Sequence, residues 1–222
     1  MGSQVAAIGG EMGLVVALPE ELGPFRGKGD PFELGGLHIT RHRVGDTVLL
    51  CAVAGVGKVA AARAGALLIA AGARRALLVA GVCGALRRNM KVGDLIHCAR
   101  TAQADLALRE GRELDPDGTL LATWRRVVPG SAGWFLTADR PVLSPWRRLR
   151  LARAFAGPCV ADMETAAVAR VADFAGVPWA ALRAVTDSAG FGAGGHFRAN
   201  FPTQAGRAAG TVEALVHALA RP

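Results

Sequence analysis

The sequence predicts a single α/β domain in which helices cover both faces of a central sheet. Short apolar runs alternate with segments of helical character along the chain, which is typical of strands and helices packed in layers. The length of 222 residues corresponds to one domain, and no internal repeat divides the chain. We therefore expect residues 1–222 to form one unit.

The expected strands are short aliphatic runs bounded by residues that favour turns. They cover residues 13–18, 47–54, 76–80, 92–99, 133–137 and 179–186. Helices are predicted over residues 59–71, 164–175 and 206–220. Residues 102–132 are polar and weakly periodic, so we expect them to lie outside the core. The glycine-rich stretch 190–195 is predicted to be a mobile loop.

The chain carries a formal net charge of +8, and such a surplus can attract nucleic acid, anionic lipid or an acidic substrate. The densest group of cations is Arg140, Arg147, Arg148, Arg150 and Arg153. Beyond Trp146, no aromatic residues are interleaved with it, so a solvated helix face explains it better than a nucleic-acid interface. We expect no nucleic-acid partner, and nucleic-acid binding is the weakest alternative.

The four cysteines, Cys51, Cys83, Cys98 and Cys159, form no CxxC pair and no cluster with histidine at zinc spacing. Three of them lie in apolar runs, which predicts buried, reduced thiols. The chain shows no signal-peptide pattern and no uncharged apolar stretch of about 18 residues. We therefore expect a soluble cytoplasmic protein without a metal site or membrane contact.

Polar residues and glycines follow several predicted strands, where α/β sheets gather their ligands. These positions are Glu20 and Glu21, Gly55–Gly57, Gly81–Gly84 and Asp187, and Asp162–Glu164 join them at the start of a predicted helix. Arg183 and Asp187 also bracket the end of an apolar strand, where a charge is costly unless it is paired or functional. Several different elements thus contribute acids to one crevice. This arrangement indicates a ligand site rather than ordinary acids at helix ends.

Five motifs follow one another along the chain: GVGK at 55–58, GVCGAL at 81–86, KVGD at 91–94, DMETAAVARV at 162–171 and VPWAALRAVTD at 177–187. In this order they resemble the purine nucleoside phosphorylase and nucleosidase family, and most of all its methylthioadenosine/S-adenosylhomocysteine nucleosidase branch. DMETAA followed by RAVTD is the most specific part. The resemblance implies a mixed central sheet, a purine nucleoside substrate, no cofactor, and a homo-oligomer, expected to be a dimer.

The resemblance also implies a role for individual residues. Asp187 matches the general acid at purine N7, and Glu164 matches the acid that binds the ribose hydroxyls. Glu21 and Arg183 match residues that position the attacking water. The other predicted substrate contacts are Met163 at the sugar, Phe197 over the nucleoside, the main chain near Val142 at the purine edge, and Val82, Cys83, Gly84 and Asp162.

These residue types suit cleavage of a C1′–N9 bond, which leaves an oxocarbenium-like sugar and an anionic purine. Protonation of N7 neutralises the purine, so Asp187 must be neutral near pH 7, and this requires a pKa raised by desolvation or by a neighbouring acid. A second carboxylate on the opposite face of the sugar can take a proton from water, as in inverting glycosidases.

Two valines favour water over phosphate as the nucleophile. Val82 stands where many relatives carry serine or threonine, and Val79 stands where many purine phosphorylases carry arginine. A buried phosphate needs several strong donors, so hydrolysis is predicted. Futalosine hydrolysis is a close alternative and phosphorolysis comes next, because other arginines still allow a phosphate site. The alternative of another class is a nucleoside-binding protein without activity.

Overall fold

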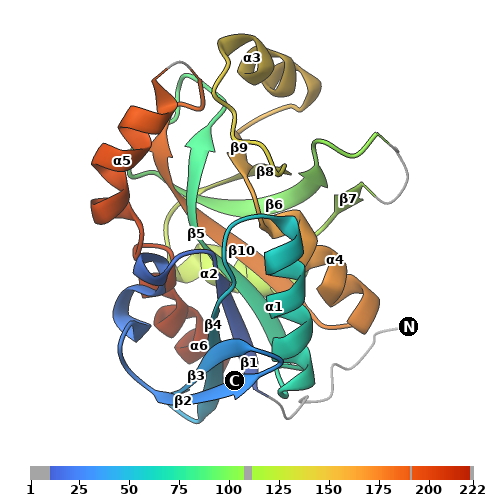
Figure 1. Ribbon diagram of the computed structural model, residues 1–222, viewed down its shortest axis with the longest axis vertical. Helices are drawn as coiled ribbons and strands as arrows, with labels where there is room; N and C mark the ends of the chain where they lie inside the picture. Colours follow the sequence, from blue (N-terminus) through green and yellow to red (C-terminus); the bar gives the residue numbers. More distant parts are fainter. Residues whose placement is uncertain (1–10, 108–111, 191, 221–222) are drawn as a thin grey trace.

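The computed structural model describes residues 11–107, 112–190 and 192–220, and Figure 1 shows the arrangement of its elements. The strands are β1 (Met12–Val16), β2 (Asp30–Leu34), β3 (Leu37–Val44), β4 (Thr47–Val53), β5 (Ala76–Ala85), β6 (Leu95–Gln103), β7 (Glu113–Leu114), β8 (Ser131–Thr137), β9 (Cys159–Asp162) and β10 (Trp179–Asp187). The helices are η1 (Pro19–Phe25), α1 (Lys58–Ala70), α2 (Gly118–Val127), α3 (Pro145–Ala154), α4 (Thr165–Ala175), α5 (Ala193–Gln204), η2 (Ala209–Thr211) and α6 (Val212–Ala220), with η1 and η2 of the 3-10 type.

The strands form one mixed sheet in the order β10-β6-β8-β9-β5-β1-β4-β3-β2, with β7 beside β6. The strands β4, β1, β5 and β10 pair in parallel, whereas β2 and β3 are antiparallel to their neighbours. Because β10 pairs with both β5 and β6, the strands β5, β9, β8, β6 and β10 close into a ring. The parallel strands end at the same side, which brings the residues after them into one crevice.

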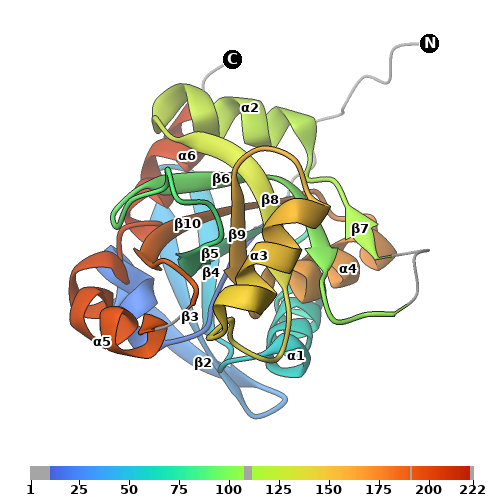
Figure 2. The ribbon, with the colours of Figure 1, turned by 90° about the horizontal axis from the view of Figure 1, so that it is seen from above.

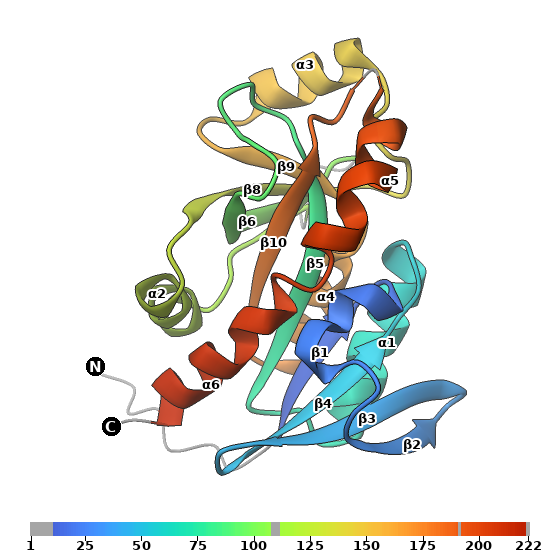
Figure 3. The same cartoon turned by 90° about the vertical axis from the view of Figure 1, so that its left-hand side faces the viewer.

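Helices cover both faces of this sheet, as Figure 3 shows. On one face, α1 and α4 pack together and bury Leu68 and Val168 against the strands. On the other face, α2 and α6 bury Trp124 and Leu215. The helices α3 and α5 lie at the end of the molecule toward which β5 runs (Figure 1), and Figure 2 views the molecule from this end. The predicted α/β fold with a mixed sheet and two helical faces is confirmed.

Four strands, β2, β3, β7 and β9, were not predicted, and β2 and β3 form one edge of the sheet. Their outward positions carry charged or polar side chains, and in β3 the exposed His38, Arg41 and Arg43 alternate with buried residues such as Ile39. The prediction that residues 102–132 lie outside the core is wrong for α2. Asp117 caps this helix by accepting the N–H of Leu120, and Trp124 is buried in the core.

The glycine-rich stretch predicted as a loop contains the start of α5 at Ala193, and residue 191 lies outside the described residues. The predicted closing helix is shorter, because η2 precedes α6. The basic segment forms α3, with Arg150 and Arg153 exposed and Arg148 donating to the main-chain oxygen of Leu86. All four cysteines are free and buried. None of the described helices has the length and apolar character needed to cross a bilayer.

Candidate active site

A pocket of about 360 Å³ lies where β1, β5, β8, β9 and β10 end. Small-molecule sites measure about 300–1,000 Å³, so the pocket has the size of a ligand site. Most of its wall is apolar, with Leu18, Leu136 and Phe197 among the contributing residues. The charged residues of the wall are Glu21, Arg140, Asp162, Glu164, Arg183 and Asp187.

Every residue that was predicted to have a catalytic or substrate-binding role contributes to this wall. They are Glu21, Val82, Cys83, Gly84, Val142, Asp162, Met163, Glu164, Arg183, Asp187 and Phe197. The structure therefore brings the whole predicted set together, although the role of each residue stays a prediction. Within the residues that the structure describes, no group of three or more His, Cys, Asp or Glu side chains is placed to hold a metal ion.

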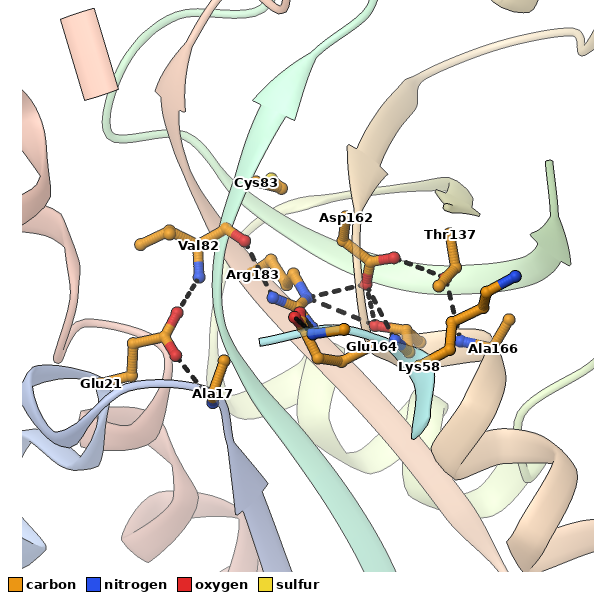
Figure 4. Close-up of polar contacts among 12 residues, drawn as sticks. Ala17, Glu21, Lys58, Val82, Cys83, Thr137, Asp162, Glu164, Ala166 and Arg183 are labelled. Carbon is orange, nitrogen blue, oxygen red and sulfur yellow. Dashed lines mark hydrogen bonds and ion pairs between the residues drawn. The ribbon is translucent and has the colours of Figure 1, made fainter. Parts of the chain in front are cut away.

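Glu21 enters the pocket from η1, directly after β1. Its Oε2 accepts the N–H groups of Ala17 and Leu18, both at 2.9 Å, and its Oε1 accepts the N–H of Val82 at 2.9 Å (Figure 4). Burial raises the pKa of Glu21, although the charge of Arg183 opposes this shift. The three donors fix the orientation of this carboxylate, and its raised pKa makes it a stronger base than an exposed glutamate.

Two glycines of the GVCG segment, which lies within β5, are explained by the close approach of site residues. A Cβ atom on Gly81 would lie 2.5 Å from Glu21 Oε1 and 3.1 Å from Arg183 Nη1. A Cβ atom on Gly84 would lie 3.0 Å from Asp187 Oδ1. Any side chain at either position would displace these groups, so the two glycines of β5 make space for the charged residues of the pocket.

Arg183 is enclosed by protein and joins two carboxylates (Figure 4). Its Nε lies 2.9 Å from Asp162 Oδ2, its Nη2 lies 3.0 Å from Glu164 Oε2, and its Nη1 donates to the main-chain oxygen of Val82. Burial alone would lower the pKa of Arg183, but Asp162 and Glu164 raise it overall. The guanidinium therefore stays charged and holds the two acids in place.

Asp162 lies behind this arginine. Its side chain has an exposed fraction of 0%, and besides Arg183 it accepts hydrogen bonds from the hydroxyls of Thr137 and Thr165. A carboxylate enclosed in this way supports Arg183. A ligand in the pocket would therefore meet the main chain of Asp162 rather than its carboxylate.

Glu164 lies at the N-terminus of α4, where the helix dipole favours a negative charge. Its Oε1 accepts the N–H of Gly57 at 3.0 Å, and its Oε2 faces Arg183. Burial raises the pKa of Glu164, although Arg183 opposes this shift. Gly57 has a φ of +101°, which favours glycine. The hydrogen bond from Gly57 thus connects the loop before α1 to Glu164, the predicted ribose-binding acid.

Asp187 ends β10, and its Oδ1 accepts the N–H of Ala189 at 2.8 Å. Burial raises the pKa of Asp187, while the hydrogen bonds from Ala189 and Thr186 oppose this shift. The net direction favours the neutral form, which agrees with the requirement for an acid at N7.

Lys58 joins three loops around the pocket, and sequence analysis did not identify this contact. Its Nζ lies 2.7 Å from Asp105 Oδ1 and 3.5 Å from Asp139 Oδ2, and its N–H donates to Asp139 Oδ1 at 2.9 Å. Asp139 in turn donates its N–H to Asp105. We call these three residues the lysine latch. Gly57, whose N–H binds Glu164, directly precedes Lys58. The lysine latch therefore holds in place the N–H group that orients the Glu164 carboxylate.

The Lys58→Met variant is expected to keep its fold, because partly exposed ion pairs contribute at most about 1 kcal/mol each. Its KM for substrate should rise and its kcat/KM should fall about five- to tenfold, since Gly57 is held less firmly against Glu164. Steady-state kinetics measure both values, with Lys28→Met as the matched surface control. An unchanged KM would show that the latch does not orient the site.

A family model described as "Phosphorylase superfamily" matches residues 5–221. The chain belongs to this superfamily. The resemblance found in the motifs is thereby confirmed, and it accounts for the order in which the glycine turns, DMETAA and RAVTD occur along the chain.

Individual relatives and structures are similar over most of the chain. The 5′-methylthioadenosine/S-adenosylhomocysteine nucleosidase of Mycobacterium bovis is 28% identical over 234 residues, covering 84% of this chain and 89% of the relative. The aminodeoxyfutalosine nucleosidase of Campylobacter jejuni is 28% identical over 159 residues, covering 64% and 69%. The S-adenosylhomocysteine nucleosidase structure from Streptococcus pyogenes, in complex with 5-methylthiotubericidin, has a TM-score of 0.88 at 24% identity and covers 96% of this chain and 99% of that chain. This structural likeness shows the fold.

Proposed function

We propose that this chain is a purine nucleosidase that hydrolyses the N-glycosidic bond of a 5′-methylthioadenosine/S-adenosylhomocysteine-type nucleoside. The products are adenine and the free sugar, and residues 1–222 act as one domain without a cofactor. The names of the relatives support this assignment, and so does the meeting of the buried carboxylates of Glu21, Glu164 and Asp187 in one pocket.

In the proposed reaction, Asp187 donates a proton to purine N7 as the C1′–N9 bond breaks and its electron pair passes to the purine. Glu21 takes a proton from water, whose oxygen bonds to C1′, and Arg183 and Glu21 together orient that water. Glu164 accepts hydrogen bonds from the ribose hydroxyls, with Met163 against the sugar. The main chain at Val142 faces the purine edge. Each positioned acid or base typically contributes about 100- to 10,000-fold in rate.

The hydrogen bond between Glu21 and Val82 is the observation that favours water over phosphate as the nucleophile. The main-chain N–H of Val82 is a donor that the glycine-rich part of β5 offers, and the Glu21 carboxylate already accepts it at 2.9 Å. A phosphate at this position would meet a buried negative charge, and neither Val79 nor the Val82 side chain supplies a donor. Hydrolysis therefore fits the pocket better than phosphorolysis.

Base release is expected to proceed at full rate in phosphate-free buffer and to yield free sugar. Chromatography of both products, with and without added phosphate, measures this directly across a panel of nucleosides. A sugar 1-phosphate product that forms only when phosphate is present would make the chain a phosphorylase. Tight binding of nucleosides without any turnover would make it a binding protein.

Futalosine-type hydrolysis is the second candidate, and the similarity to the aminodeoxyfutalosine nucleosidase of Campylobacter jejuni favours it. The same substrate panel distinguishes the two. An aspartate at position 187, where one phosphorylase branch uses asparagine, resembles the pattern for 6-aminopurines, so adenine nucleosides should react faster than inosine-type ones. A preference for a 6-oxopurine substrate would move the assignment toward futalosine hydrolysis.

We also propose a cytoplasmic homodimer in which a second copy covers the pocket mouth. Val56 and Leu143 line the pocket and are 52% and 55% exposed. The nearby chain positions Val59 and Trp146 are 83% and 81% exposed. Apolar surface at a pocket rim is typical of a protein interface. Analytical ultracentrifugation tests this proposal, and a monomer at assay concentration would contradict it.

A further inference from the structure

Thr186 occupies an irregular position in β10, next to the predicted general acid. Along the pairing of β10 with β5, Val185 lies opposite Cys83 and Asp187 lies opposite Gly84, so Thr186 is an extra residue between them. Such a bulge changes the direction in which neighbouring side chains point. Thr186 is fully buried and lies in the pocket wall.

The hydroxyl of Thr186 lies between two oxygen atoms. Its Oγ1 is 3.2 Å from the main-chain oxygen of Cys83 and 2.9 Å from Asp187 Oδ2. A hydroxyl has one proton to donate, and a carbonyl oxygen can only accept. Thr186 can therefore donate to Cys83 or to Asp187, but not to both at once.

The other carboxyl oxygen of Asp187, Oδ1, already accepts a hydrogen bond. Oδ1 accepts the N–H of Ala189 at 2.8 Å, and in a neutral acid the carbonyl oxygen accepts such a bond better than the hydroxyl oxygen does. Among the described residues, Ala189 is the only non-glycine with a positive φ, at +40°, so this donor is held in a conformation that alanine rarely adopts. The proton of neutral Asp187 consequently lies on Oδ2, the oxygen beside Thr186.

We propose that Thr186 is a positioning residue whose hydroxyl rotates with the protonation state of Asp187. While Asp187 is neutral, the hydroxyl donates to Cys83 and leaves the Oδ2 proton free for purine N7. Once that proton has moved to N7, the hydroxyl turns and donates to the charged Oδ2. Thr186 keeps its own proton throughout, so the only proton transferred is the one that Asp187 loses. The inference rests on the proposed role of Asp187 as general acid.

The test compares Thr186→Val, which removes the hydroxyl at nearly constant shape, with Thr186→Ser, which keeps it. In Thr186→Val, kcat for an adenine nucleoside should fall about ten- to one-hundredfold with KM nearly unchanged, because the forming carboxylate loses a donor. Turnover of a nitrophenyl riboside, whose leaving group needs no proton, should change little. The alkaline limb of the pH profile should move to higher pH, and Thr186→Ser should retain most of the activity.

Thr101→Val is the matched control, since Thr101 is equally buried and donates to the main-chain oxygen of Phe135. If Thr186→Val does not fold, Thr186→Ala removes the same hydroxyl in a smaller side chain. Wild-type kinetics in the hydroxyl-free variant, or equal losses on both substrates without a pH shift, would overturn the inference and leave the proposed function intact. An inactive wild-type protein would overturn the proposed function and this inference with it.

Discussion

The Asp187→Asn variant is expected to bind a non-hydrolysable nucleoside analogue nearly as tightly as the wild type and to lose about two to four orders of magnitude in kcat. Asparagine keeps the shape, and its oxygen can still accept the N–H of Ala189, which now binds Oδ1. Its amide can then donate a hydrogen bond toward N7 but has no proton to transfer. The loss should therefore appear in kcat rather than in affinity.

Calorimetric titration gives the affinity, and steady-state kinetics give kcat. Asp173→Asn is the matched control, since Asp173 is exposed and pairs with Arg170 at the surface. The variant should lose least with a nitrophenyl riboside, whose leaving group needs no protonation. Near-normal turnover of adenine nucleosides by Asp187→Asn would remove Asp187 from the mechanism.

The pH profile of the wild type gives a second measure of the same acid. Only neutral Asp187 can protonate N7, so kcat/KM should fall as the pH rises through its pKa. Burial raises the pKa of Asp187, which places this fall at higher pH than for an exposed aspartate. On the acid side the rate should fall as Glu21 takes up a proton, and burial raises the pKa of Glu21 as well. The alkaline limb should be absent in Asp187→Asn.

The site could be predicted from the sequence because its acids follow elements with a strong pattern. Glu21 and Asp187 come after aliphatic runs that form β1 and β10, and Glu164 precedes the alanine-rich α4. Parallel strands that end at one side of a sheet bring such residues together wherever they stand in the chain. The local pattern was thus sufficient to place them in one pocket.

The remaining features depend on tertiary contacts that no local pattern encodes. The lysine latch joins Lys58 to residues 47 and 81 positions away, and the lysine of GVGK was its only local sign. The bulge at Thr186 arises from the register between two strands. Similarly, α2 was missed because its buried residues, such as Trp124, lie within a polar segment and contact another helix, α6.

The Glu164→Gln variant is expected to lose at least about two orders of magnitude in kcat/KM. A hydrogen bond to a charged group contributes about 1.5–3 kcal/mol, and those to the ribose hydroxyls should strengthen as the sugar becomes cationic in the transition state. The structure adds a second cause. Both carboxylate oxygens of Glu164 face donors, Gly57 N–H and Arg183 Nη2, so the amide group of glutamine would point a donor at one of them.

The kinetic effect of this variant separates a ligand-binding acid from a helix-end acid. If Glu164 served only the helix dipole at the start of α4, its neutral replacement would lower stability slightly and leave turnover unchanged. The exposed Glu213, in the first turn of α6, is the matched position for such a purely helical role. Kinetics and thermal unfolding of Glu164→Gln and Glu213→Gln distinguish the two cases. A folded Glu164→Gln protein with most of its activity would contradict the ribose-binding role, because the ribose hydroxyls would then not depend on the charge of this acid.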